Sequence, residues 1–159
     1  MKKLILLLLV AAFVGGNTLS AQTITKNEDG KYSLSVGHVT LTVDAQKGGK
    51  IVSYRYDDKE ILSQTKIPNS FGSTFWTSPQ SEWNWPPVPE YDTKPFNAEV
   101  AGDKLILTGE KSKRFGYRVR KELTTDKKDN AIVITYTIIN ESGETRKVAP
   151  WEISRVPNG

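Results

Sequence analysis

Cysteine is absent from this sequence of 159 residues, and histidine occurs once, as His38. The absence of cysteine excludes disulfides, thiol catalysis, a cysteine-linked lipid anchor, and cysteine-ligated zinc or iron–sulfur centres. A single histidine excludes multi-histidine metal sites, and its position beside a strand pattern predicts a structural or solvated role. The Asp57-Asp58 pair is predicted to be a turn, because no calcium-loop spacing follows it. We therefore expect no cofactor and no metal.

No apolar run reaches the roughly 20 residues that are needed to cross a bilayer. The longest, residues 4–14, follows Lys2 and Lys3, and a short segment then leads to Ala21 before Gln22. A positive start, an apolar core and a small residue before the cut are typical of a cleavable secretory signal peptide. We predict that residues 1–21 are removed and that the protein is periplasmic or secreted, with no transmembrane segment after cleavage. The alternative is an uncleaved anchor.

Clusters of one charge are also scarce. Without the two signal lysines the formal net charge falls from +4 to +2, and the remaining basic residues are scattered. The nearest to basic clusters, Lys111 to Arg114 and Lys127-Lys128, are expected to be solvated turn residues. We predict no nucleic-acid partner. An exported chain without disulfides must be held by its apolar core, which favours one sizeable sheet domain over residues 22–159.

The hydrophobic pattern beyond residue 21 has a period of two, and no stretch shows a convincing helical period. Val39, Leu41 and Val43 alternate with threonines, as in a strand with one buried face. Further strands are predicted at residues 50–56, 60–62, 104–108, 116–123 and 131–140. The last of these is apolar or β-branched on both faces, so we place it centrally in a sheet covered on both sides. The fold class is predicted to be all-β, an antiparallel β-sandwich.

Residues 67–96 interrupt this pattern with six of the eight prolines and three of the four tryptophans. Proline removes hydrogen-bond donors from a ladder, so most of this stretch is predicted to be loop. A loop of this length in a compact domain is usually functional when it is ordered.

Trp83 and Trp85 are the central candidates for binding in this loop. In an extended segment they would point the same way, and an indole face stacks well on the C–H face of a sugar. Gln80 and Glu82 add groups that can hydrogen-bond hydroxyl pairs, and Trp76 is a further candidate. The prolines would stiffen the loop and lower the entropy cost of binding. The alternative is that the tryptophans plug the open end of the sandwich.

Glu152 and Arg155 complete the candidate set, near the C-terminus. Alternation puts Trp151, Ile153 and Arg155 on one face of a strand and Glu152 on the other. A carboxylate near aromatics could act as a general base or accept a sugar hydroxyl. The alternative is an ion pair near a strand end.

These motifs resemble a known superfamily. The Gly48-Gly49 entry to a strand and the return at residues 58–62 are similar to the opening hairpin of galactose mutarotase-like domains. The blocks at residues 71–80, 83–87 and 150–155 resemble a secreted domain-of-unknown-function family, number 4380, within that superfamily. The resemblance covers residues 30–159. It implies an antiparallel supersandwich with a sugar-binding groove on one sheet.

The sequence departs from this superfamily in two ways. Mutarotases use a glutamate base and a histidine acid, and residues 149–152 lack the histidine expected there. Such domains are also longer, so we expect an incomplete supersandwich, an N-terminal fragment with unpaired edges and an exposed core face.

Three functions remain open. The first is an exported carbohydrate-binding domain that recognises a mono- or oligosaccharide without catalysis. The second is an aldose epimerase or other sugar-active enzyme with Glu152 as general base. The third is a structural envelope protein whose tryptophans are all buried.

Overall fold

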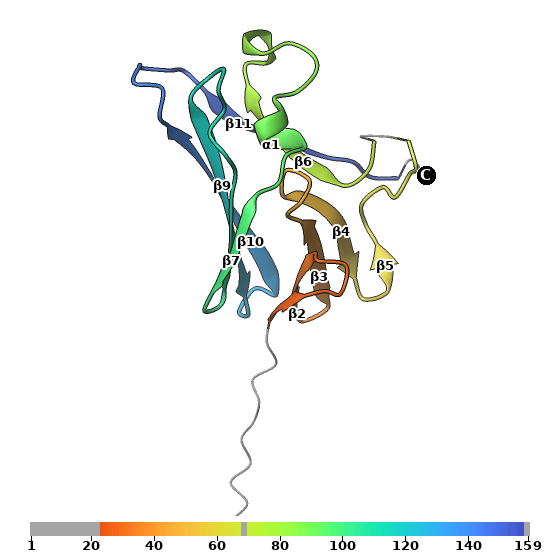
Figure 1. Cartoon of the computed structure of the whole chain (residues 1–159). Helices are drawn as coiled ribbons and strands as arrows, with labels where there is room; N and C mark the ends of the chain where they lie inside the picture. Colours follow the sequence, from red (N-terminus) through yellow and green to blue (C-terminus); the bar gives the residue numbers. More distant parts are fainter. Residues whose placement is uncertain (1–22, 68–69, 158–159) are drawn as a thin grey trace, which may run out of the picture.

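Two antiparallel sheets pack face to face in the computed structural model, which describes residues 23–67 and 70–157 (Figure 1). The predicted signal peptide, residues 1–21, lies outside the described residues. The prediction of an all-β sandwich with antiparallel strands is confirmed. Within the described ranges, no helix has the length and apolarity to span a membrane.

The larger sheet has seven strands and the smaller has four. In spatial order, the larger sheet consists of β1 (Ile24–Lys26), β2 (Tyr32–Val36), β3 (Val39–Asp44), β4 (Lys50–Tyr56), β6 (Ser73–Ser78) and β11 (Ala149–Ser154), with β5 (Lys59–Glu60) paired to β4. The smaller sheet consists of β10 (Ala131–Asn140), β9 (Tyr117–Asp126), β8 (Lys104–Thr108) and β7 (Asn97–Ala101).

The core lies between the sheets and follows from the period of two. Val39, Leu41 and Val43 on β3 are buried, as their alternation with threonine predicts, whereas the threonines between them are only half-buried. From the smaller sheet, Leu105 and Val119 have no exposed surface. Fully burying an aliphatic side chain of this kind contributes about 1.5–3 kcal/mol. In the absence of disulfides, this burial holds the two sheets together.

The prediction for residues 131–140 is wrong in one respect. They form the strand β10, but β10 is the edge strand of the smaller sheet within the described residues, not a central one. Val133 is 45% exposed, and the threonines on the same face are exposed as well. The opposite face, with Ile134 and Tyr136, is half-buried against the core. The β-branched residues on the outer face reflect strand propensity rather than burial.

The Gly48-Gly49 turn between β3 and β4 brings the loop region onto the sandwich. Both glycines have positive φ, at +63° and +58°, a conformation that L side chains adopt at a cost. A Cβ on Gly48 would lie 2.4 Å from the carbonyl oxygen of Asp92, in the short helix α1 (Pro89–Asp92). The Gly48 N–H donates to the carbonyl oxygen of Lys94 at 2.9 Å. Glycine is therefore required here so that α1 can pack directly on the turn.

The chain from residue 79 to residue 96 arches over the end of β6 (Figure 1). It contains the 3-10 turn η1 (Gln80–Glu82) and α1, and no strand. This part of the predicted loop is therefore confirmed. Residues 73–78, by contrast, are not loop but the buried strand β6 between β4 and β11.

Candidate functional site

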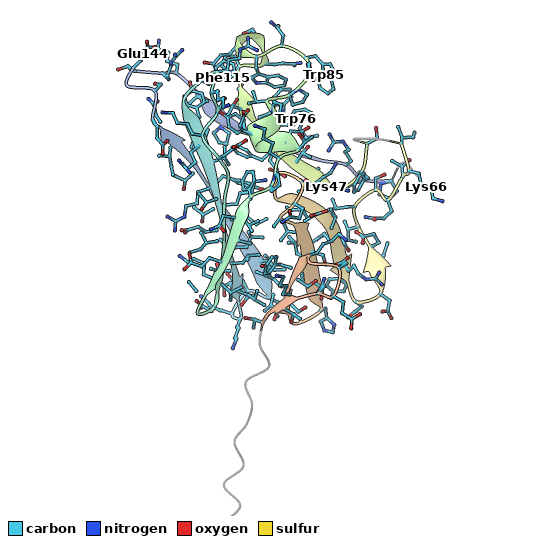
Figure 2. The ribbon with its side chains drawn as sticks, viewed as in Figure 1. Lys47, Lys66, Trp76, Trp85, Phe115 and Glu144 are labelled. Carbon is cyan, nitrogen blue, oxygen red and sulfur yellow. The ribbon has the colours of Figure 1, made fainter. Side chains whose placement is uncertain are left out.

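All four tryptophans of the chain lie in one aromatic cluster centred on Trp76. Its ring centroid is 5.9 Å from that of Trp83, 5.8 Å from that of Trp85 and 5.6 Å from that of Trp151. The three pairs are edge-on, an arrangement that the quadrupoles of aromatic rings favour. Figure 2 shows Trp76 and Trp85 close together beside α1. We call these four residues the tryptophan cluster.

Strand pairing brings two of the four together. Trp76 on β6 lies directly opposite Trp151 on β11. The neighbouring Phe75 stacks on Tyr136 of the smaller sheet at 4.7 Å, so Phe75 faces the interior and Trp76 faces outward from the sandwich. The Trp76 indole is nonetheless buried, and its Nε1 donates to a carboxylate oxygen of Asp92 in α1 at 2.8 Å.

Sequence reasoning did not include Trp151 or Asp92 in the candidate set. The alternation in residues 151–155 did place Trp151 on the same strand face as Arg155. That alternation was therefore a signal by which Trp151 could have been included. Nothing in the sequence indicates that Asp92 meets Trp76, because that contact depends on how the loop folds back.

Trp83 and Trp85 have opposite environments, although they are two residues apart. Trp83 is 3% exposed, and its Nε1 donates to the carbonyl oxygen of Thr77 at 2.8 Å. Trp85 is 63% exposed. The segment is not extended, because η1 precedes it and Asn84 has a φ of +55°. Trp83 therefore supports the loop, and Trp85 presents an indole to solvent.

The two polar candidates in η1 also differ. Glu82 points toward β9, where one carboxylate oxygen accepts a hydrogen bond from the Tyr117 hydroxyl at 3.3 Å and the other is buried without a partner among the described residues. Burial and the nearby charge of Glu82 raise the pKa of Tyr117. Gln80 is exposed and lines a hollow of about 410 Å³ together with Pro79, Pro150 and Trp151. Gln80 is thus free to bind, whereas Glu82 is engaged in the fold.

A second hollow, of about 310 Å³, opens beside Trp85; we call it the Trp85 hollow. Its lining is mostly apolar with three charged residues, and comprises Trp83, Trp85, Pro86, Pro87, Val88, Pro89, Glu90, Lys113 and Arg114. The Arg114 guanidinium donates to the carbonyl oxygens of Glu82, at 3.2 Å, and Trp83, at 3.3 Å. Arg114 was expected to be a solvated turn residue; its side chain is exposed but anchored to the loop.

Arg155, which directly follows the C-terminal end of β11, contacts the tryptophan cluster. Its guanidinium carbon lies 5.9 Å from the ring centroid of Trp76, within the range of a cation–π contact. It also donates to the hydroxyl of Thr74 at 3.1 Å. Lys50 is close by, and burial together with the charge of Arg155 lowers the pKa of its ammonium. Arg155 therefore adds positive charge to the outer face of the larger sheet.

Glu152 lies on the opposite face of β11 from the cluster, as the alternation predicts. Its carboxylate accepts a hydrogen bond from Ser73 on β6. Burial and the charge of Glu152 raise the pKa of Tyr136 on β10. Glu152 thus lies on the side of β11 that faces the smaller sheet, where it is exposed to solvent, and β11 itself separates it from the indoles.

The predicted set therefore divides in three. Trp76, Trp83, Trp85 and Arg155 come together, and Gln80 and Glu82 occupy the adjoining turn. Glu152 stands apart. His38 is in the β2–β3 turn, where its Nδ1 lies 2.6 Å from an Asp57 carboxylate oxygen and its ring stacks on Tyr56. The chain's single histidine therefore takes no part in the cluster.

The sequence matches no family model and no curated protein. Among solved structures, the fold is similar to part of a 4-alpha-glucanotransferase from Thermococcus litoralis, with a TM-score of 0.46 and 15% sequence identity. The similarity covers 72% of this chain and 23% of that enzyme, so the chain spans less than a quarter of the enzyme's length. A likeness this distant carries no functional conclusion.

Proposed function

We propose that this protein is an exported carbohydrate-binding domain of the galactose mutarotase-like superfamily, and that it binds sugar on the exposed indole of Trp85 without catalysing a reaction. The observation that carries the proposal is the state of Trp85, which is 63% exposed yet held edge-on against the buried Trp76. An exposed, oriented indole offers a flat apolar face to a sugar ring and an N–H to a hydroxyl.

The surroundings of Trp85 support this role. Pro86 and Pro87 follow it directly, and their fixed φ angles limit how far the loop can move. A stiff loop loses little conformational entropy when a ligand binds, so more of the contact energy appears as affinity. Gln80, in the neighbouring hollow, can hydrogen-bond a hydroxyl.

The absence of catalysis is proposed for geometric reasons. Trp85 packs against Trp76, which faces outward from the larger sheet, whereas Glu152 lies on the other side of that sheet. The only histidine, His38, is bound to Asp57 in a turn away from the cluster. Acid–base chemistry requires both groups within hydrogen-bond reach of the same substrate. A purely structural role with all indoles buried is not favoured either, because Trp85 is exposed.

The test is binding of the exported protein to soluble polysaccharides, measured by affinity gel electrophoresis and by tryptophan fluorescence. The panel includes starch, xylan, galactomannan and polygalacturonate. We expect at least one polymer to retard the protein, and we expect Trp85→Ala to weaken that binding by about 30-fold, equivalent to about 2 kcal/mol at the centre of a binding surface.

Tyr56→Ala is the matched control, because Tyr56 is 54% exposed and lies outside the tryptophan cluster. Binding by this variant should equal that of the wild type. No retardation by any polymer, or equal retardation of wild type and Trp85→Ala, would contradict the proposal.

A further inference from the structure

We infer that the carbohydrate is anionic, a polysaccharide that carries carboxylate or sulfate groups. This inference rests on the proposed function and concerns the positive charge around the Trp85 hollow. Lys113 and Arg114 line that hollow together with Trp85. The one acidic residue in its lining, Glu90, is buried and accepts a hydrogen bond from Lys94 at 3.1 Å.

The two cations of the hollow are not neutralised by the protein. Within the described residues, neither Lys113 nor Arg114 has a carboxylate oxygen within 4.0 Å, although nine other ion pairs are formed. Both side chains are exposed. A neutral sugar stacked on Trp85 would leave their charges unused, whereas an anionic sugar would pair with them.

Arg114 is oriented in advance for this pairing. Two of its N–H groups are bound to the carbonyl oxygens of Glu82 and Trp83, and its guanidinium lies 4.8 Å from the ring centroid of Phe115. A guanidinium has five N–H donors, so three stay without a protein partner in the described part of the chain. A planar, anchored guanidinium binds a carboxylate or sulfate with two parallel hydrogen bonds at little entropic cost.

The positive charge continues beyond the Trp85 hollow. A neighbouring hollow of about 220 Å³ shares Lys113 and Arg114 and adds Lys111 and Arg146 to its lining. A third, of about 430 Å³, is lined by Arg146 and Lys147. We call Lys111, Lys113, Arg114, Arg146 and Lys147 the basic rim.

The acidic residues near the basic rim do not cancel it. Glu141 is paired with Arg118 at 3.0 Å, and Glu144 with Arg146 at 2.9 Å. With Arg118 included, six basic and two acidic side chains leave a net charge of +4, and counting Glu90 in the lining and Glu82 beside Arg114 reduces it to +2. The surface beside the exposed tryptophan is therefore net positive. A row of cations over several hollows fits a polymer with repeated charges better than a single small anion.

The test compares polymers that differ only in charge. Polygalacturonate is compared with its fully methyl-esterified form, and dextran sulfate with dextran, by affinity electrophoresis of the exported protein at 50 and 300 mM salt. We expect one charged polymer to bind at least 10-fold more tightly than its neutral counterpart at 50 mM salt. That preference should shrink at 300 mM, because salt screens exposed charges.

Variants identify the residues responsible. The Lys113 side chain makes no hydrogen bond or ion pair within the described residues. Lys113→Gln therefore removes one positive charge from the hollow without disturbing the loop. It should lower affinity for the charged polymer by about 5-fold and leave the neutral one unchanged. Arg114→Gln should lower it by about 10-fold, with thermal melting as a check of folding. Lys128→Gln, the same charge change in the exposed β9–β10 turn, is the matched control and should have no effect.

The outcomes separate this inference from the proposed function. Equal binding of charged and neutral polymers, with binding still sensitive to Trp85→Ala, would overturn the inference and leave the proposed function standing. Binding of no polymer would overturn both. Single-stranded DNA of random sequence is included, because indoles and cations also bind nucleic acid. Tighter binding of the DNA than of either acidic polysaccharide would overturn the inference as well.

Discussion

Replacing Lys121 with methionine should change how the stability of this protein depends on pH. Lys121 lies on β9 and is 3% exposed, with its Nζ donating to the carbonyl oxygens of Gly48 at 2.8 Å and Gly49 at 3.0 Å. The ammonium also lies 5.3 Å from the ring centroid of Phe96. These contacts offset only part of the cost of burying a charge. Burial therefore lowers the pKa of Lys121 to about 8.

The sign and size of the effect follow from linkage. In the unfolded chain the lysine has its ordinary pKa of 10.5, so between pH 8 and 10.5 the unfolded state binds more protons than the folded state. The free energy of unfolding contributed by this group therefore rises with pH across that window. Lowering the pKa of Lys121 from 10.5 to about 8 corresponds to about 3 kcal/mol between pH 7 and pH 10.5.

The measurement is urea unfolding, monitored by tryptophan fluorescence, at pH 7, 8, 9, 10 and 10.5. The wild type should gain about 3 kcal/mol relative to Lys121→Met from the lowest to the highest pH. Comparison with the variant cancels the titration of other groups. The control variant Lys128→Met replaces an exposed lysine, and its free energy of unfolding should depend on pH as that of the wild type does. If the wild type and Lys121→Met change in parallel over the whole range, the buried ammonium does not have a depressed pKa and the reasoning fails.

Two further predictions concern the support of the site. Gly48→Ala should lower the free energy of unfolding by about 3 kcal/mol or more, because φ is +63° and a Cβ would lie 2.4 Å from the carbonyl oxygen of Asp92. Gly30→Ala is its control in the same urea titration and should cost only about 1 kcal/mol, since φ is also positive but no atom lies within 4 Å. Trp76→Phe should lower stability by about 1–2 kcal/mol, because the Asp92 carboxylate loses its indole donor. It should also weaken polysaccharide binding in affinity electrophoresis; unchanged binding would mean that Trp76 does not orient the exposed indole.

Much of the fold could be predicted from the sequence, because strand formation and side-chain alternation are local. The period of two in residues 39–43 places three apolar residues in the core regardless of what packs against them. The same rule placed Glu152 and Trp151 on opposite faces of β11 before any partner strand was known. The rule could not place β10 in its sheet, because β-branched residues are favoured in strands whether or not they are buried.

The sequence predicted several residues of the candidate site, but not how they are arranged. A proline-rich loop with clustered tryptophans indicated where binding groups gather, and Trp76, Trp83 and Trp85 do lie together. Which indole is exposed was not predictable, because the backbone of residues 80–84 decides it through η1 and the positive φ of Asn84. Lys113 and Arg114 were expected to be ordinary turn residues, and nothing in the local sequence shows that they border the Trp85 hollow.

The sequence by itself determined the strands β3, β4, β8, β9, β10 and β11, the faces of β3 and β11, and the exclusion of thiol and multi-histidine chemistry, since each of these depends on residue type and short-range spacing. It did not predict β1, β2, β6 or β7. Only the tertiary structure decided which residues meet. Trp151 contacts Trp76 because β11 pairs with β6, although the two are 75 positions apart in the chain. Arg114 lies beside Trp85 because its guanidinium binds the carbonyl groups of a loop some 30 residues earlier. Contacts of this kind depend on long-range packing and hydrogen bonding, which the local pattern of a sequence does not encode.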